Sequence, residues 1–86
     1  MHDVELFGVP RLLTGIRVVA AAGETLGDVA RDLCARQPAL AGAVFDAEHW
    51  LLPGYAFVVA DSFTRDPALV VPSGTSVLLV ATAAGG

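Results

Sequence analysis

Residues 23–38 read GETLGDVARDLCARQP, and this stretch predicts the main helix of the fold. Thr25 is a typical N-cap, and Asp28, three residues later, would lie at the positive end of the helix. Apolar residues follow at the i, i+3, i+4, i+7 and i+8 spacing of a helix with one buried face: Leu26, Val29, Ala30, Leu33 and Cys34. Pro38 predicts that the helix ends at about Gln37, because a residue before proline disfavours the helical conformation.

Strands are predicted before and after this helix in the sequence, where short apolar runs rich in β-branched residues are bounded by turn residues. These runs are residues 4–8, 16–20, 55–60, 69–71 and 76–81. Pro10 and Gly15 bracket the connection between the first two strands, and residues 40–45 are expected to form one helical turn under the core. The predicted fold is therefore α+β, with a mixed sheet packed on one main helix.

The last predicted strand raises a question, because it is apolar on both faces. Leu78 and Val80 alternate with the residues that would face the helix. A single helix covers only one face of a sheet, and the other face of a half-exposed sheet normally carries polar residues. Either residues 40–54 pack on the second face, or this face is an apolar patch that meets a partner. The same two interpretations, core or partner contact, apply to Phe7.

The composition excludes several classes of protein. The 86 residues are 55% hydrophobic and 16% charged, which predicts one globular domain. The formal net charge of −4 disfavours binding to nucleic acid or to an anionic membrane. No apolar run reaches the ~18 residues of a membrane span, and the first residues lack the basic region of a signal peptide.

The residue usage also bears on location and origin. Cys34 is the only cysteine, so no internal disulfide can form and a cytoplasmic location is the default expectation. The chain has no lysine and no asparagine, which is typical of a GC-rich bacterial genome.

No catalytic or metal-binding cluster is recognisable in the sequence, so no enzyme activity and no metal site are predicted. Asp46, Glu48 and His49 share one stretch, for which a solvated loop is a better interpretation than a metal site. Trp50 is expected to anchor that loop to the body of the domain. Cys34 lies on the apolar stripe of the helix and is expected to be a small buried residue.

In order and spacing, the sequence resembles the β-grasp (ubiquitin-like) sulfur carrier proteins, the family of the molybdopterin synthase small subunit and the thiamine sulfur carrier. The resemblance covers nearly the whole chain and rests on four stretches: residues 4–15, 23–29, 38–40 and 74–86. It implies a sheet of four to five strands in a domain of residues 1–82. A tail of residues 83–86, which ends in a Gly-Gly pair, would follow this domain.

The resemblance implies that the functional group is the carboxylate of Gly86. An adenylating, E1-like enzyme would activate this carboxylate with ATP, and a sulfur donor would convert the acyl-adenylate to a thiocarboxylate. A synthase such as the large subunit of molybdopterin synthase would accept the sulfur. Ala83, Ala84 and Gly85 would form a slim arm that passes a narrow tunnel in the partner, because these residues add little bulk. The carrier itself would bind no cofactor.

The residues expected to contact these partners are Phe7, Leu78 and Val80. Other functions stay open: a ubiquitin-like interaction module with a coincidental Gly-Gly pair, or a protein modifier joined through Gly86 to target lysines. Within the carrier interpretation, residues 4–15 favour molybdopterin synthesis, but thiamine, cysteine or a secondary metabolite could receive the sulfur.

Two departures from the family pattern bear on the subfamily. Ala81-Thr82 stands where the family often has Pro-Pro, and Asp61-Ser62 stands where it often has Asn-Gly. Residues 61–65 are expected to form a polar loop.

Overall fold

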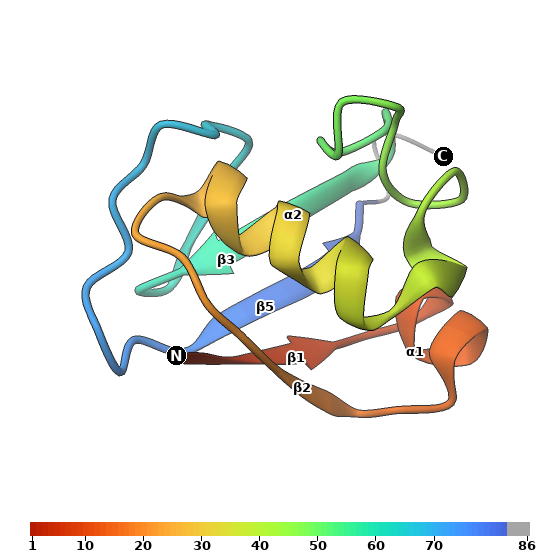
Figure 1. Ribbon diagram of the computed structural model, residues 1–86, viewed down its shortest axis with the longest axis horizontal. Helices are drawn as coiled ribbons and strands as arrows, with labels where there is room; N and C mark the ends of the chain where they lie inside the picture. The colour runs from red at the N-terminus through yellow and green to blue at the C-terminus, as the bar shows by residue number, and fades with distance from the viewer. Residues whose placement is uncertain (83–86) are drawn as a thin grey trace.

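The computed structural model describes residues 1–82 and shows two layers, a five-stranded sheet and a helix that crosses one of its faces (Figure 1). The elements in chain order are β1 (His2–Leu6), α1 (Val9–Thr14), β2 (Val18–Ala21), α2 (Leu26–Arg36), the 3₁₀ helix η1 (Pro38–Leu40), β3 (Tyr55–Val59), β4 (Ser62–Thr64) and β5 (Val77–Ala81). The strand order is β2-β1-β5-β3-β4, in which β1 and β5 are parallel and the other neighbours are antiparallel. The predicted α+β class, a mixed sheet with one main helix, is confirmed. None of the helices in the described residues is long and apolar enough to cross a membrane.

Helix α2 has the boundaries that the sequence predicts. The Asp28 N–H donates to Thr25 Oγ1 at 3.2 Å, and the Thr25 N–H donates to Asp28 Oδ2 at 3.4 Å, which is a capping box. All five apolar residues of the predicted stripe are buried in the core. The helix ends at Arg36, and the following Gln37 N–H donates to the Leu33 carbonyl oxygen.

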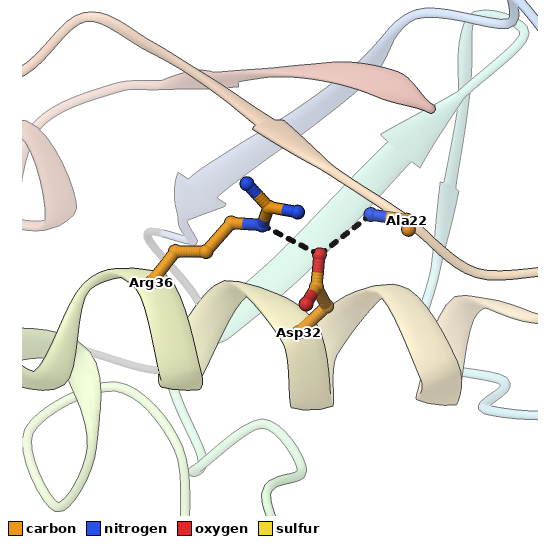
Figure 2. A network of polar contacts seen from close by, with 3 residues as sticks. All are labelled: Ala22, Asp32 and Arg36. Atoms are coloured by element: carbon orange, nitrogen blue, oxygen red, sulfur yellow. Dashed lines mark hydrogen bonds and ion pairs between the residues drawn. The ribbon is translucent and has the colours of Figure 1, made fainter.

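One carboxylate ties the outer side of α2 to the chain that follows β2. Asp32 Oδ2 accepts hydrogen bonds from the Ala22 N–H and from Arg36 Nε–H, both at 2.7 Å (Figure 2). The bond from the Ala22 N–H, and after it the bond from Arg36, holds the pKa of the Asp32 carboxyl below its usual value. The ionised form of Asp32 is therefore the form that fixes the helix to this segment.

We expect Asp32→Asn to lower the free energy of unfolding at neutral pH by about 0.5 kcal/mol, because a neutral amide is a weaker acceptor and solvent screens this position. The folded pKa lies below the unfolded pKa, so the contribution of the charge is complete above the unfolded value. It is lost as the pH falls through the folded value. Urea unfolding of both proteins from neutral to acid pH measures the difference, which should shrink toward zero at the acid end. A difference that stays constant with pH would show that the charge of Asp32 plays no part.

The prediction of a strand over residues 69–71 is wrong. In this stretch only Val70 pairs, through an isolated bridge to Thr25. The β-branched run that suggests a strand is used instead to cover the start of α2, where the Leu26 N–H donates to the Leu69 carbonyl oxygen at 2.8 Å.

The fourth strand of the sheet is β4, in the stretch expected to be a polar loop. Ala60 and Asp61 both have positive φ angles, 50° and 66°, as the tightest hairpin turns require. This turn brings Ser62 opposite Val59 and makes β4 the edge strand beside β3.

The long segment between η1 and β3 packs on the same side of the sheet as α2. Phe45 and Leu51 are buried, and the rings of Phe45 and Trp50 lie 6.1 Å and 5.8 Å from the ring of Phe57 on β3. The prediction that Trp50 anchors this loop is confirmed. The interpretation in which residues 40–54 cover the second face of the sheet is wrong, because they complete the core on the first face.

Candidate functional site

The face of the sheet opposite α2 carries an apolar row. By strand register, one line of side chains across all five strands consists of Val18, Glu5, Leu78, Val58 and Phe63. Four of these five are apolar, and their exposure rises from half-buried at the centre of the sheet to 72% at Phe63 on its edge. We call this surface, with Phe7 and Val80 beside the row, the open face.

The three residues expected to contact partners lie together on the open face. Leu78 and Val80 are two positions apart on β5, so they share a face, and both are half-buried. The Phe7 N–H donates to the Leu79 carbonyl oxygen at 3.0 Å, which extends the β1–β5 register and places Phe7 beside Val80. Phe7 is 43% exposed and is therefore a surface residue. That these three side chains contact a partner stays a prediction.

Strand β5 leaves the sheet beside the start of β3. Ala81 pairs with Tyr55, and the Thr82 N–H donates to the Gly54 carbonyl oxygen at 2.8 Å. Gly54 has a φ of 95°, a conformation that favours glycine. The chain is thus held on the sheet up to Thr82. We call these four residues the exit.

The residues expected to form the arm and the functional group lie outside the described residues. They are Ala83, Ala84, Gly85 and Gly86.

The side chain of Arg65 binds backbone oxygens of the loop that leads into the exit. Arg65, which follows β4, donates from Nη2 to the Leu51 carbonyl oxygen at 3.2 Å and from Nη1 to the Leu52 carbonyl oxygen at 3.3 Å. Nη1 also donates to the carbonyl oxygen of Tyr55. The guanidinium therefore bridges backbone groups on both sides of Gly54, through charge-assisted bonds that are roughly twice as strong as neutral ones. The sequence places Arg65 only in a polar stretch, because no pattern marks an arginine that will bind backbone oxygens.

We expect Arg65→Met to loosen the exit while the rest of the fold keeps its stability. The variant leaves three carbonyl oxygens to water, which should lower the local stability by about 1 kcal/mol at this exposed position. Amide hydrogen exchange followed by NMR should become faster at the Thr82 N–H, while the Gln37 N–H at the end of α2 keeps its protection. Equal acceleration at both amides would assign Arg65 to the stability of the whole domain instead.

The position of Cys34, the one cysteine of the sequence, does not favour nucleophilic reaction of its thiol. Cys34 is 6% exposed, on the buried side of α2, which confirms its predicted place in the core. Burial, and after it the charge of Asp46, raises the pKa of the thiol, so it stays protonated and is a poor nucleophile at neutral pH. Within residues 1–82, no group of three or more His, Cys, Asp or Glu side chains is arranged to hold a metal ion.

Comparison with known proteins finds similar structures but no similar sequence family. No protein-family model and no curated protein matches the chain. The structure of SAMP1 from Haloferax volcanii matches with a TM-score of 0.82 at 22% identity, covering 99% of this chain and 98% of that chain. CysO from Mycobacterium tuberculosis, described as an antigen, matches with a TM-score of 0.79 at 26% identity over 95% of this chain and 99% of that chain. A chain of the BexX/CysO complex from Amycolatopsis orientalis matches with a TM-score of 0.79 at 23% identity over the full length of both chains.

These similarities establish the fold. The chain has the β-grasp, ubiquitin-like fold, and its structural neighbours are β-grasp proteins of the small-modifier and sulfur-carrier kind. The resemblance drawn from the sequence is confirmed at this level, and the sheet has five strands.

Proposed function

We propose that the chain is a sulfur carrier whose Gly86 carboxylate is adenylated by an activating enzyme and converted to a thiocarboxylate. One observation carries the proposal: the central strand β5 runs to the rim of the sheet and is held there by the Thr82–Gly54 bond, shortly before the Gly85-Gly86 pair. The described domain thus holds the chain at the rim of the sheet up to Thr82, and four residues with little side-chain bulk, Ala83-Ala84-Gly85-Gly86, follow in the sequence. The match to SAMP1 and CysO over almost the whole chain supports a β-grasp domain of the small-modifier and sulfur-carrier kind.

Adenylation solves a problem of reactivity. A carboxylate oxygen of Gly86 attacks the α-phosphorus of ATP, pyrophosphate leaves, and the acyl-adenylate that forms has AMP as a good leaving group. Hydrosulfide then attacks the carbonyl carbon, a C–S bond forms, and AMP departs with one former carboxylate oxygen while a proton is released. Glycine has no side chain beside this carbon, so both steps meet little steric hindrance. The carrier is a co-substrate in this scheme, and the activating enzyme supplies the catalysis. Because the first step consumes ATP, we place the carrier in the cytoplasm.

The first step can be tested by ATP–pyrophosphate exchange with the purified adenylating enzyme encoded in the same genome. We expect label from pyrophosphate to enter ATP only when the chain is present. Cys34→Ala should exchange at the wild-type rate, because this buried thiol takes no part. Exchange that continues with a carboxamide in place of the Gly86 carboxylate would overturn the proposal.

The proposed acceptor of the sulfur is a synthase of the molybdopterin type, on the resemblance of residues 4–15 to that branch. Incubating the thiocarboxylated chain with the large subunit of molybdopterin synthase and its substrate should return the carboxylate form. Sulfur that stays on the chain under these conditions would direct the search to an acceptor in thiamine, cysteine or secondary-metabolite synthesis.

A second candidate function is protein modification, which the match to SAMP1 favours, since H. volcanii SAMP1 is a small archaeal modifier protein. In this case cell extracts would contain higher-mass conjugates of the chain that require Gly86. The two functions use the same adenylated carboxylate and differ in whether a sulfur or a lysine amine attacks it.

A further inference from the structure

Helix α1 turns its apolar residues toward solvent. Val9, Leu12 and Leu13 share one side of the helix at the i, i+3 and i+4 spacing, and Ile16 follows where the next turn would lie. Their exposed fractions are 42%, 82%, 42% and 36%, whereas only Pro10 of α1 is buried. An apolar stripe at this spacing normally faces the core. We call these four exposed residues the α1 stripe.

The two charged residues that neighbour the α1 stripe in the sequence are basic, on a chain that is acidic overall. Arg11 and Arg17 stand next to it in the sequence, and no acidic residue occurs between Glu5 and Glu24. Neither arginine forms an ion pair within residues 1–82. On a chain of net charge −4, such a surface is complementary to a partner that carries carboxylates.

The α1 stripe lies at the end of the sheet where the chain leaves it. Strands β1 and β5 are parallel neighbours, so their carboxyl ends reach the same rim. Helix α1 follows the carboxyl end of β1 and contacts β5 (Figure 1). An enzyme that draws Gly86 into its ATP site must approach this rim, and α1 then falls within its reach.

We infer that the α1 stripe, with Arg11 and Arg17, is the docking surface for the adenylating enzyme, which meets it with an apolar recess rimmed by carboxylates. The inference rests on the proposed function, and it adds a recognition surface that is separate from the reacting carboxylate. A second copy of this chain is a poorer occupant, because an isologous contact would bring the arginines of the two copies together.

The size of this surface suits a short-lived complex. A standard stable interface buries roughly 800 Å² on each partner, more than four partly exposed apolar side chains supply. A carrier has to leave the enzyme once it is loaded in order to reach the sulfur acceptor. A small apolar surface binds weakly and so allows this release, while the charges beside it speed the encounter with the enzyme.

The test is the affinity of the full chain for the purified adenylating enzyme encoded in the same genome, measured by titration calorimetry without ATP. We expect Leu12→Ser to weaken binding at least roughly tenfold, as removal of an apolar anchor does, and Arg11→Glu to weaken it by a similar factor. The matched controls are Val70→Ser, in the segment before β5 and away from the open face, and Arg31→Glu on α2. Val70 is 66% exposed and Leu12 is 82% exposed, so Val70→Ser and Leu12→Ser should both fold normally. Both controls should bind within about twofold of the wild type.

A chain that lacks Gly86 separates the docking surface from the chemical group. It should bind the enzyme like the full chain, and Leu12→Ser should weaken this binding too. If Leu12→Ser binds as tightly as Val70→Ser while the full chain is adenylated, the docking surface is refuted and the proposed function stands. A full chain that neither binds nor is adenylated refutes both.

Two further measurements identify a different occupant. Sedimentation that shows a dimer dissolved by Leu12→Ser would assign the α1 stripe to a second copy of the chain. Binding to vesicles of anionic phospholipid that Arg11→Glu abolishes would assign it to a lipid surface. Either result would overturn the inference.

Discussion

A chain that ends at Gly85 is expected to lose sulfur loading by at least roughly 100-fold while its fold stays intact. The truncated chain still ends in an unhindered glycine carboxylate, so the truncation changes how far this carboxylate extends from the domain and not its chemistry. Removing one extended residue withdraws the carboxylate by about 3.3–3.6 Å. Misplacement of a reacting group by only ~1 Å can lower a rate by ~10²-fold. Loading is measured as the rate at which the thiocarboxylate appears in the presence of the adenylating enzyme, ATP and sulfide.

The matching controls separate reach from bulk and from folding. Gly86→Ala keeps the length of the chain and adds one methyl group beside the carbonyl, so it should retain more loading than the truncated chain. The thermal unfolding midpoint should be the same for all three proteins, because the core and the exit are formed by residues of the described range 1–82. A truncated chain that loads at the wild-type rate would remove Gly86 from the mechanism.

Gly23→Ala is expected to destabilise the domain by about 2–4 kcal/mol, the largest stability effect that we predict for a single methyl group. A Cβ atom at this position would lie 2.6 Å from the Val29 nitrogen and 2.8 Å from Asp28 Cβ. The first of these neighbours is helix backbone, so α2 itself would have to move. Such a shift would pull apart the capping box between Thr25 and Asp28. Domains of this size have a total stability of only ~5–10 kcal/mol, so the loss should be visible in the urea unfolding midpoint.

The control for this prediction is Gly15→Ala. A Cβ atom there has no neighbour within 4 Å, and the only penalty is the φ of 71°, which costs an alanine about 1 kcal/mol. Equal destabilisation by the two variants would mean that close approach to α2 is not what requires glycine at position 23.

The helix was the most predictable part of the fold because its signals are local. The N-cap, the apolar stripe and Pro38 all lie within residues 23–38, and each is a property of one turn of helix. The strands at the centre of the sheet were predictable for a similar reason, since β3 and β5 are continuous runs of apolar residues.

The elements that sequence reasoning missed depend on tertiary context. Helix α1 looks like a connection because its apolar residues face solvent and its ends carry Pro10 and Gly15. The edge strand β4 has three residues, and its pairing depends on a turn at Ala60 and Asp61 that lacks the usual Asn-Gly pair. Residues 69–71 have the composition of a strand but find no neighbour to form a ladder with.

The candidate site also contains some residues that could be predicted from the sequence and one that could not. Phe7, Leu78 and Val80 could be selected from the sequence because an apolar residue on the uncovered face of a sheet breaks the expected alternation. Their placement side by side follows from the β1–β5 register. Arg65 could not be selected, since its partners are backbone oxygens at positions 51, 52 and 55, which any residue type would offer.

The central claim is that the carboxylate of Gly86 accepts sulfur. Its most direct test is the intact mass of the full chain after incubation with the adenylating enzyme, ATP and sulfide. We predict a gain equal to the exchange of one oxygen for one sulfur, located at Gly86 by fragmentation and absent when ATP is omitted. An unchanged mass, or a sulfur added at Cys34 instead of Gly86, would contradict the claim.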